Sequence, residues 1–278
     1  MEKKNNHYVP KCLLKRWSLS NGIYDGVFVL NCSSKTIDFS SAKGSKAFSF
    51  ASINNLYILD KDNNRYTSLE DWLSGLEGIL SMFIDKVARK ESTFLKDHTQ
   101  LHKLLMGLLS FNFRSRYFFQ EGEKYIDSNP QIKSQFAEKS SLQILLENLV
   151  NATTYKANQL FPVEFIICNS TVPLLVCDRP LLYNVFDGYS FIPLSPYLLL
   201  SFRKAQRQST IIYQDIDDNL VDSFNKQIIE AARDWIVSTN KEELENIMEG
   251  RNFEYSDEVI FEEFKTLIHG YEYQLNAT

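Results

Sequence analysis

The spacing of apolar and polar positions changes three times along the chain, and each change separates one group of predicted elements from the next. Residues 26–31 and 35–39 are short runs of strand type, and they predict a hairpin near the start. From residue 67 to 152 the apolar positions recur every three or four residues. This spacing predicts long amphipathic helices: one that begins at Thr67 or Ser68, one from about Asp97 to Phe119 and one from about Ile132 to Asn151.

Beyond residue 160 the period shortens again. Runs of strand type separated by turn residues predict a meander-like antiparallel sheet, with strands at 163–168, 173–177, 181–185, 189–193 and 198–202 and a possible sixth at 211–213. Helical spacing returns at 219–237, 242–248 and 258–267.

The order of these groups predicts one α+β domain over residues 1–278, with an antiparallel or mixed sheet and a bundle of long amphipathic helices. Its parts are N-terminal strands (1–60), a helical region (67–152), a sheet (163–213) and C-terminal helices (219–270).

The composition of the chain limits the cellular compartments and the classes of partner that we expect. The formal net charge of −5 argues against a generally basic surface that coats nucleic acid, although it allows a local basic patch. Four scattered cysteines without a CxxC pair indicate reduced thiols, and the nine-residue spacing of Cys168 and Cys177 allows a disulfide without indicating one. We find no signal peptide and no apolar run long enough to span a bilayer, so we expect a cytoplasmic protein without a membrane partner.

The densest chemistry lies near the N-terminus. Pro10 favours an extended arm before it, with the side chains of His7, Tyr8 and Val9 alternating in direction, and a helix after it. Cations beside His7 lower its proton affinity, which suits a general base near neutral pH. The alternative is a structural tether in which His7 bonds a backbone carbonyl and Tyr8 packs. The charged and aromatic residues of this stretch are His7, Tyr8, Lys11, Lys15, Arg16 and Trp17.

Three later features allow both a functional and a structural interpretation. Arg114, after an apolar helix, can clamp a phosphate or simply complement the helix dipole. Asp178, after an apolar strand, can be catalytic or can close an Asx-turn. His98 and His102 have the four-residue spacing of two metal ligands on a helix, but no third ligand is evident. The sequence therefore predicts no metal and no cofactor.

Several motifs together resemble the family of domains of unknown function numbered DUF 4238. An opening His7-Tyr8-Val9-Pro10 precedes Leu14-Lys15-Arg16-Trp17. The later matches are Leu69-Glu70, Leu76-Glu77, Phe111-Asn112-Phe113-Arg114, Cys177-Asp178-Arg179-Pro180, Pro193-Leu194-Ser195-Pro196, Asn225 and Ala231-Ala232-Arg233. The family pattern has Gln where this chain has Lys11, Arg where it has Lys15, and Ser-Asp-Asn where it has Cys177-Asp178-Arg179.

This resemblance, to a mostly bacterial family, implies that residues far apart in sequence form one site. We expect His7 and Asp178 to be catalytic, with Tyr8, Lys11, Arg16 and Arg114 binding a phosphate or another ligand. The first hypothesis is a metal-independent, nuclease-like phosphodiesterase, an effector in phage defence in which Asp178 orients His7. The second is a non-enzymatic sensor or binding module for a nucleotide, a nucleic acid or a phage component. The third is a buried polar network that fixes the arm.

Overall fold

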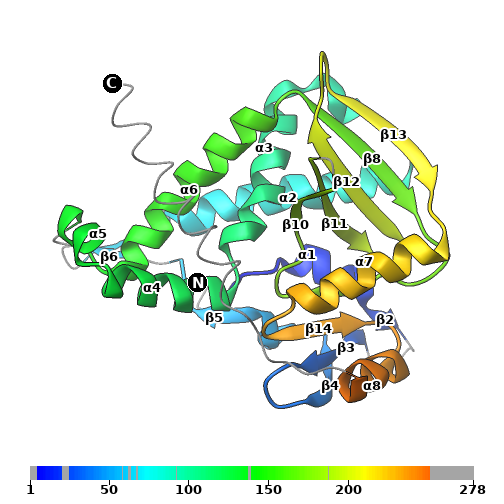
Figure 1. Cartoon of the computed structure of the whole chain (residues 1–278), viewed down its shortest axis with the longest axis horizontal. Helices are drawn as coiled ribbons and strands as arrows, with labels where there is room; N and C mark the ends of the chain where they lie inside the picture. Colours follow the sequence, from blue (N-terminus) through cyan, green and yellow to red (C-terminus); the bar gives the residue numbers. More distant parts are fainter. Residues whose placement is uncertain are drawn as a thin grey trace.

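Two five-stranded sheets and a set of packed helices make up the fold (Figure 1). The computed structural model describes residues 5–20, 25–57, 59–61, 64–66, 68–91, 93–136, 139–186 and 188–250. Helices and strands share these ranges, so the predicted single α+β domain with a mixed sheet and long amphipathic helices is confirmed. The helix predicted at 258–267 lies outside the described residues.

Helices form within the region of helical spacing, with their ends set by local capping. The third predicted helix, 132–151, is wrong in its bounds, because the chain forms two helices there, Pro130–Gln135 and Ser141–Leu160. Asp97 caps α3 by accepting a hydrogen bond from the Gln100 backbone N–H at 3.0 Å, and Ser140 forms a capping box with Gln143 at the start of α6. The described α-helices are α1 (Lys11–Leu14), α2 (Ser68–Ala88), α3 (His98–Leu109), α4 (Arg116–Ser128), α5 (Pro130–Gln135), α6 (Ser141–Leu160), α7 (Asp218–Ala231) and α8 (Lys241–Gly250). Short 3₁₀ turns lie at Lys15–Trp17, Ser49–Ala51, Thr93–Lys96 and Ser110–Phe113.

The helix predicted from 97 to 119 is broken in two. A 3₁₀ turn follows α3, and Ser115 then caps α4 by accepting a hydrogen bond from the Phe118 N–H at 3.0 Å. Arg114 therefore lies at the junction between two helices, where its side chain is buried.

The larger sheet has the strand order β10-β11-β12-β8-β13. Its strands are β8 (Val163–Asn169), β10 (Leu182–Phe186), β11 (Tyr189–Ser195), β12 (Leu198–Lys204) and β13 (Thr210–Asp215). The predicted meander is correct for β10, β11 and β12, which pair antiparallel in sequence order. It is wrong for the sheet as a whole, because β12 next pairs with β8 and β13 joins the other edge of β8 in parallel.

The smaller sheet joins both ends of the described chain in the order β2-β3-β14-β9, with β4 on β3. Its strands are β2 (Leu19–Ser20), β3 (Asp25–Asn31), β4 (Thr36–Ser41), β9 (Val176–Cys177) and β14 (Trp235–Ser238). Two corrections follow: residues 235–237 form a strand and not the end of a helix, and the strand at Cys177 leaves the predicted meander for this sheet. Two further pairs are β1 (Asn5–His7) with β5 (Ser52–Asn54) and β6 (Leu59–Lys61) with β7 (Asn64–Tyr66).

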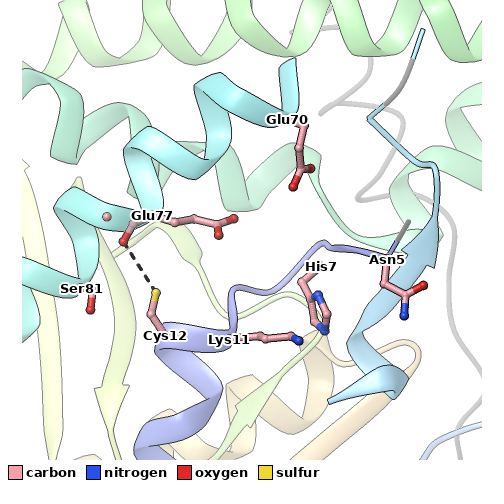
Figure 2. Close-up of a pocket in the computed structure, with 8 residues that line it drawn as sticks. Asn5, His7, Lys11, Cys12, Glu70, Glu77 and Ser81 are labelled. Atoms are coloured by element: carbon pink, nitrogen blue, oxygen red, sulfur yellow. Dashed lines mark hydrogen bonds between the residues drawn. The ribbon is translucent and has the colours of Figure 1, made fainter. Parts of the chain in front are cut away.

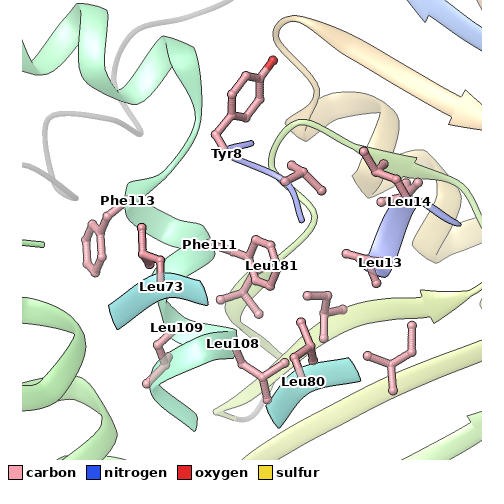
Figure 3. Close-up of a cluster of buried hydrophobic side chains, with 14 of the residues drawn as sticks. Tyr8, Leu13, Leu14, Leu73, Leu80, Leu108, Leu109, Phe111, Phe113 and Leu181 are labelled. Atoms are coloured by element: carbon pink, nitrogen blue, oxygen red, sulfur yellow. The ribbon is translucent and has the colours of Figure 1, made fainter. Parts of the chain in front are cut away.

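Two hydrophobic clusters hold these layers together. The larger one packs apolar residues of the N-terminal arm and α1 against α2, α3 and the 3₁₀ turn after α3 (Figure 3). The smaller one lies between the two sheets and buries one face of α7. Cys168 and Cys177 stand in different sheets, and all four cysteines are free thiols. No helix within the described ranges combines the length and apolar character needed to cross a membrane.

Candidate functional site on two sides of the N-terminal arm

The N-terminal arm, residues 5–10, runs extended along β5. Backbone pairing places His7 opposite Ser52, and the Tyr8 N–H donates to the Ala51 carbonyl at 3.1 Å. Because side chains alternate along an extended backbone, His7 and Tyr8 point to opposite sides of the arm. The arm therefore has two sides with different chemistry.

The His7 side opens into a pocket of about 350 Å³ between the arm and α2, here called the arm pocket. Lys11 and His7 lie on the wall made by the arm and α1, while Glu70 and Glu77 project from α2 opposite them (Figure 2). The seven-residue spacing of the two glutamates puts them on one helix face. The remaining lining residues are Asn5, Cys12, Gly78 and Ser81.

His7 is held in one orientation by a backbone carbonyl. Its Nε2 lies 3.2 Å from the Ala47 oxygen, which can only accept, so Nε2 carries the proton of the neutral ring. The other ring nitrogen, Nδ1, is then the basic atom. Burial and the charge of Lys11 lower the pKa of His7 below 6.5, so the imidazole is neutral at neutral pH.

Arg114 connects the two walls of the arm pocket, the arm and α2, through buried hydrogen bonds. One terminal nitrogen donates to Glu77 Oε1 at 2.6 Å and to the His7 backbone oxygen at 2.9 Å, and Nε donates to the Tyr57 hydroxyl at 3.2 Å. Burial works to lower the pKa of Arg114, but Tyr57 and Glu77 raise it above its ordinary value. The guanidinium stays charged and ties α2 to the arm, so it braces the pocket and does not clamp a phosphate in the observed arrangement.

Cys12 is the nucleophilic atom type nearest to this chemistry, but its environment keeps it a thiol. Burial and the nearby Glu77 raise its pKa to about 11. The thiol proton points to the Glu77 backbone oxygen, at an Sγ–O distance of 3.7 Å (Figure 2). A thiolate mechanism at neutral pH is therefore disfavoured.

The Tyr8 side is closed and lies in the protein interior. The Tyr8 hydroxyl accepts a hydrogen bond from Trp235 Nε1 at 2.8 Å. Its single proton is directed to the Phe50 carbonyl at 3.1 Å or to Asp234 Oδ2 at 3.3 Å. Burial, followed by Asp234 and Asp178, raises the pKa of Tyr8 well above its ordinary value. Because Tyr8 is 0 % exposed, it packs the arm against β14 and cannot reach a ligand in the arm pocket.

Asp178 belongs to this closed side and not to His7. Its Oδ1 accepts backbone hydrogen bonds from Arg233, Asp234 and Trp235 at 2.9, 3.1 and 3.4 Å. Its Oδ2 is buried and accepts no hydrogen bond within the described part of the chain. Burial and the neighbouring Asp234 raise the pKa of Asp178 to about 6. The expected His7–Asp178 pair is therefore corrected: Asp178 orders the turn before β14.

Arg16 and the two helical histidines also lie apart from the expected site. Arg16 pairs with Asp85 on α2 at 2.7 Å, where both side chains are partly exposed. His102 Nε2 bonds Asn158 at 2.7 Å, and the rings of His98 and His102 pack near Phe161. Among the described residues, no group of three or more potential ligands is arranged to hold a metal ion.

Three residues of the two sites were not predicted as functional. Glu70 and Glu77 belong to motifs that resemble the family, but no site role was predicted for them, although their spacing places both on one face. Asp234 gave no signal of its own, because its role depends on Asp178 and Tyr8 across three distant segments.

The fold and the site define an α+β protein in which an N-terminal arm separates a small open pocket of mixed charge from a buried acidic cluster. This chain belongs to the family described as "Protein of unknown function (DUF4238)", which it matches over residues 5–242. No curated protein and no solved structure matches the chain.

Proposed function

We propose that the chain is a binding module or sensor, and that its arm pocket holds a small ligand of nucleotide type. The observation that carries this proposal is the opposite charge of the two pocket walls. Lys11 can donate hydrogen bonds to a phosphate, while Glu70 and Glu77 on α2 and the unprotonated Nδ1 of His7 can accept from the N–H groups of a base. A pocket of about 350 Å³ is of the size that small ligands occupy.

Two arginines near the arm are already paired with carboxylates, which favours a binding function over a catalytic one. Arg114 is committed to Glu77 and to the backbone of His7, and Arg16 to Asp85. Lys11 is then the one cation among the described lining residues. A phosphoryl-transfer site would be expected to offer more positive charge to the reacting phosphate.

The second candidate is a metal-independent phosphodiesterase of nuclease type, and the observation that favours it is the state of His7. A neutral imidazole with a fixed tautomer in an open pocket suits a general base. In that reaction Nδ1 takes the proton of the attacking hydroxyl, the new P–O bond forms, and the ester oxygen leaves with a proton from solvent. The biological setting we propose for either function is defence against phage.

The deciding experiment measures binding and turnover separately. Calorimetry with AMP and GMP is run on wild type, on Lys11→Ala and on Glu70→Gln. Lys15→Ala removes an exposed cation of the next turn, outside the described pocket lining, and is the matched control. We expect at least tenfold weaker binding for the two pocket variants and no change for the control. Absence of binding to wild type overturns the proposal.

Turnover is followed with a labelled oligonucleotide in the presence of EDTA. Binding without cleavage supports the sensor. Cleavage that His7→Gln abolishes, with binding retained, supports the phosphodiesterase instead. Phage plaque counts in cells expressing wild type or Lys11→Ala then test the setting, because protection that depends on Lys11 ties defence to the arm pocket.

A further inference from the structure

A second hollow, of about 510 Å³, lies at the connection between β12 and β13. Figure 1 shows the course of these two strands. Its lining includes Arg203, Lys204 and Arg207, with Glu164 as the one carboxylate among the described lining residues. Helix α7 begins at Asp218, just after β13 ends at Asp215, so it starts at the opposite end of β13 from this hollow. A cationic hollow therefore stands out on a chain whose net charge is −5.

The hollow rests on a polar row that crosses the larger sheet. Glu164 on β8 is opposite Arg203 on β12 and Thr210 on β13. Glu164 Oε1 accepts from Arg203 Nε at 2.9 Å and from the Tyr189 hydroxyl at 3.0 Å. The guanidinium of Arg203 also lies 4.2 Å from the centre of the Tyr189 ring. Strand register and three contacts thus hold Arg203 in one position.

This arrangement leaves the positive charge of the hollow directed outward. Arg203 uses Nε for Glu164, which keeps its two terminal nitrogens for another acceptor. Lys204 and Arg207 are exposed, and within the described ranges no carboxylate forms a salt bridge with either of them. Two hydrogen bonds hold the loop between β12 and β13 in place. The Ala205 N–H donates to the Pro162 carbonyl at 2.7 Å, and the Val163 N–H donates to Ser209 Oγ at 3.1 Å.

We propose that this hollow binds the phosphate backbone of a single nucleic-acid strand. A fixed arginine fork and two exposed cations match successive phosphates, and the exposed Gln206 and Gln208 add neutral donors for sugar or base edges. A flexible strand can follow a concave hollow of this size. The proposal stands independently of the ligand of the arm pocket, since the two hollows share no described lining residue.

The test is fluorescence anisotropy of a labelled single-stranded oligonucleotide with the full chain at several salt concentrations. Three phosphate contacts predict that log K falls with log salt at a slope of about −2. Lys204→Glu/Arg207→Glu is expected to weaken binding at least tenfold and to reduce the magnitude of the slope to less than about 1. Lys139→Glu/Lys241→Glu makes the same charge change at two exposed ion pairs, one between Lys139 and α6 and one within α8, and is expected to bind like wild type.

Three outcomes overturn the proposal. Unchanged affinity and slope in the Lys204/Arg207 variant remove the hollow from binding. An equal loss in the control variant shows a general effect of net charge. Full competition by inorganic phosphate at the concentration of oligonucleotide phosphates shows a site for a free anion and not for a strand.

Discussion

The two sides of the N-terminal arm use similar residue types for opposite purposes. On the His7 side, a charged lysine and two glutamates face an open pocket. On the Tyr8 side, Asp178 lies in the interior and accepts hydrogen bonds from backbone N–H groups, and Asp234 lies partly buried beside Tyr8. A carboxylate in the pocket can exchange a water for a ligand, whereas a carboxylate in the interior serves the fold and resists ionisation. One step along an extended backbone separates the two environments.

The largest expected effect comes from removing the brace between the two sides. Arg114→Met leaves Glu77 without its buried partner and the His7 carbonyl without a donor, so we expect a loss of about 3–5 kcal/mol in the free energy of unfolding. Arg16→Met removes a partly exposed pair and is expected to cost less than about 1 kcal/mol. Urea unfolding monitored by tryptophan fluorescence measures both. Equal losses would contradict the difference in burial.

The next effect concerns the pH dependence of the closed side. Folding raises the pKa of Asp178 from 3.8 to about 6, so the folded state favours the protonated acid. Its stabilising contribution is complete below pH 3.8 and is lost as the pH rises through about 6. Between pH 4 and pH 8 the wild type should therefore lose roughly 3 kcal/mol relative to Asp178→Asn.

Unfolding curves of both proteins at several pH values measure this difference. Asp38→Asn, on the exposed β4, is the control for the loss of a surface carboxylate. Parallel stability profiles for wild type and Asp178→Asn would show that Asp178 is charged in the fold at neutral pH without cost.

A smaller effect is expected from the hydroxyl of Tyr8. Tyr8→Phe keeps the ring packing but removes the acceptor of the Trp235 N–H and a neighbour of Asp234. An unsatisfied buried donor predicts a loss of about 1–3 kcal/mol. Tyr213→Phe, which removes a 3.5 Å hydrogen bond near the surface, should cost less. Differential scanning calorimetry of the two variants at one pH compares them directly.

The smallest effect on stability is expected on the open side, where function should change instead. His7→Gln is expected to alter the free energy of unfolding by less than about 1 kcal/mol and to weaken ligand binding at least tenfold. An effect that needs neutral imidazole should persist below pH 6.5, because the pKa of His7 is lowered. NMR titration of His7 measures this pKa, with His102→Gln as the binding control. A severe loss of stability would favour the tether.

Periodicity predicted most of the fold, because burial of one helix face or one strand face is a local property of the chain. Periodicity failed where contacts with residues distant in the sequence determine the local structure. Trp235, Ile236 and Val237 continue the apolar pattern of α7, yet they form a strand because β3 and β9 offer backbone partners on both sides. The break between α3 and α4 at Arg114 depends on Glu77, Tyr57 and the arm. Their hydrogen bonds to the guanidinium offset the cost of burying it at a helix junction.

The candidate site was predicted only in part for the same reason. His7 and Lys11 do lie together in a pocket, as their closeness in sequence indicates. Because side chains alternate along the arm, Tyr8 and His7 lie on opposite sides of it. Asp178 lies near Tyr8 and is therefore on the side away from His7. The sequence alone could not place Asp178, because it does not show that Asp234 and Trp235 meet the arm.

The pairing of β3 with β14 has a consequence for the order in which the protein is made. Strand β3 ends at Asn31, but its partner β14 is made of residues 235–238. The two strands can pair only after most of the chain has been synthesised. On the ribosome, the N-terminal segment therefore emerges with an unpaired strand edge and an arm whose Tyr8 has no Trp235 to accept from. Contacts of such long sequence separation close late and slowly. We expect the nascent chain to depend on holding chaperones until β14 has left the exit tunnel.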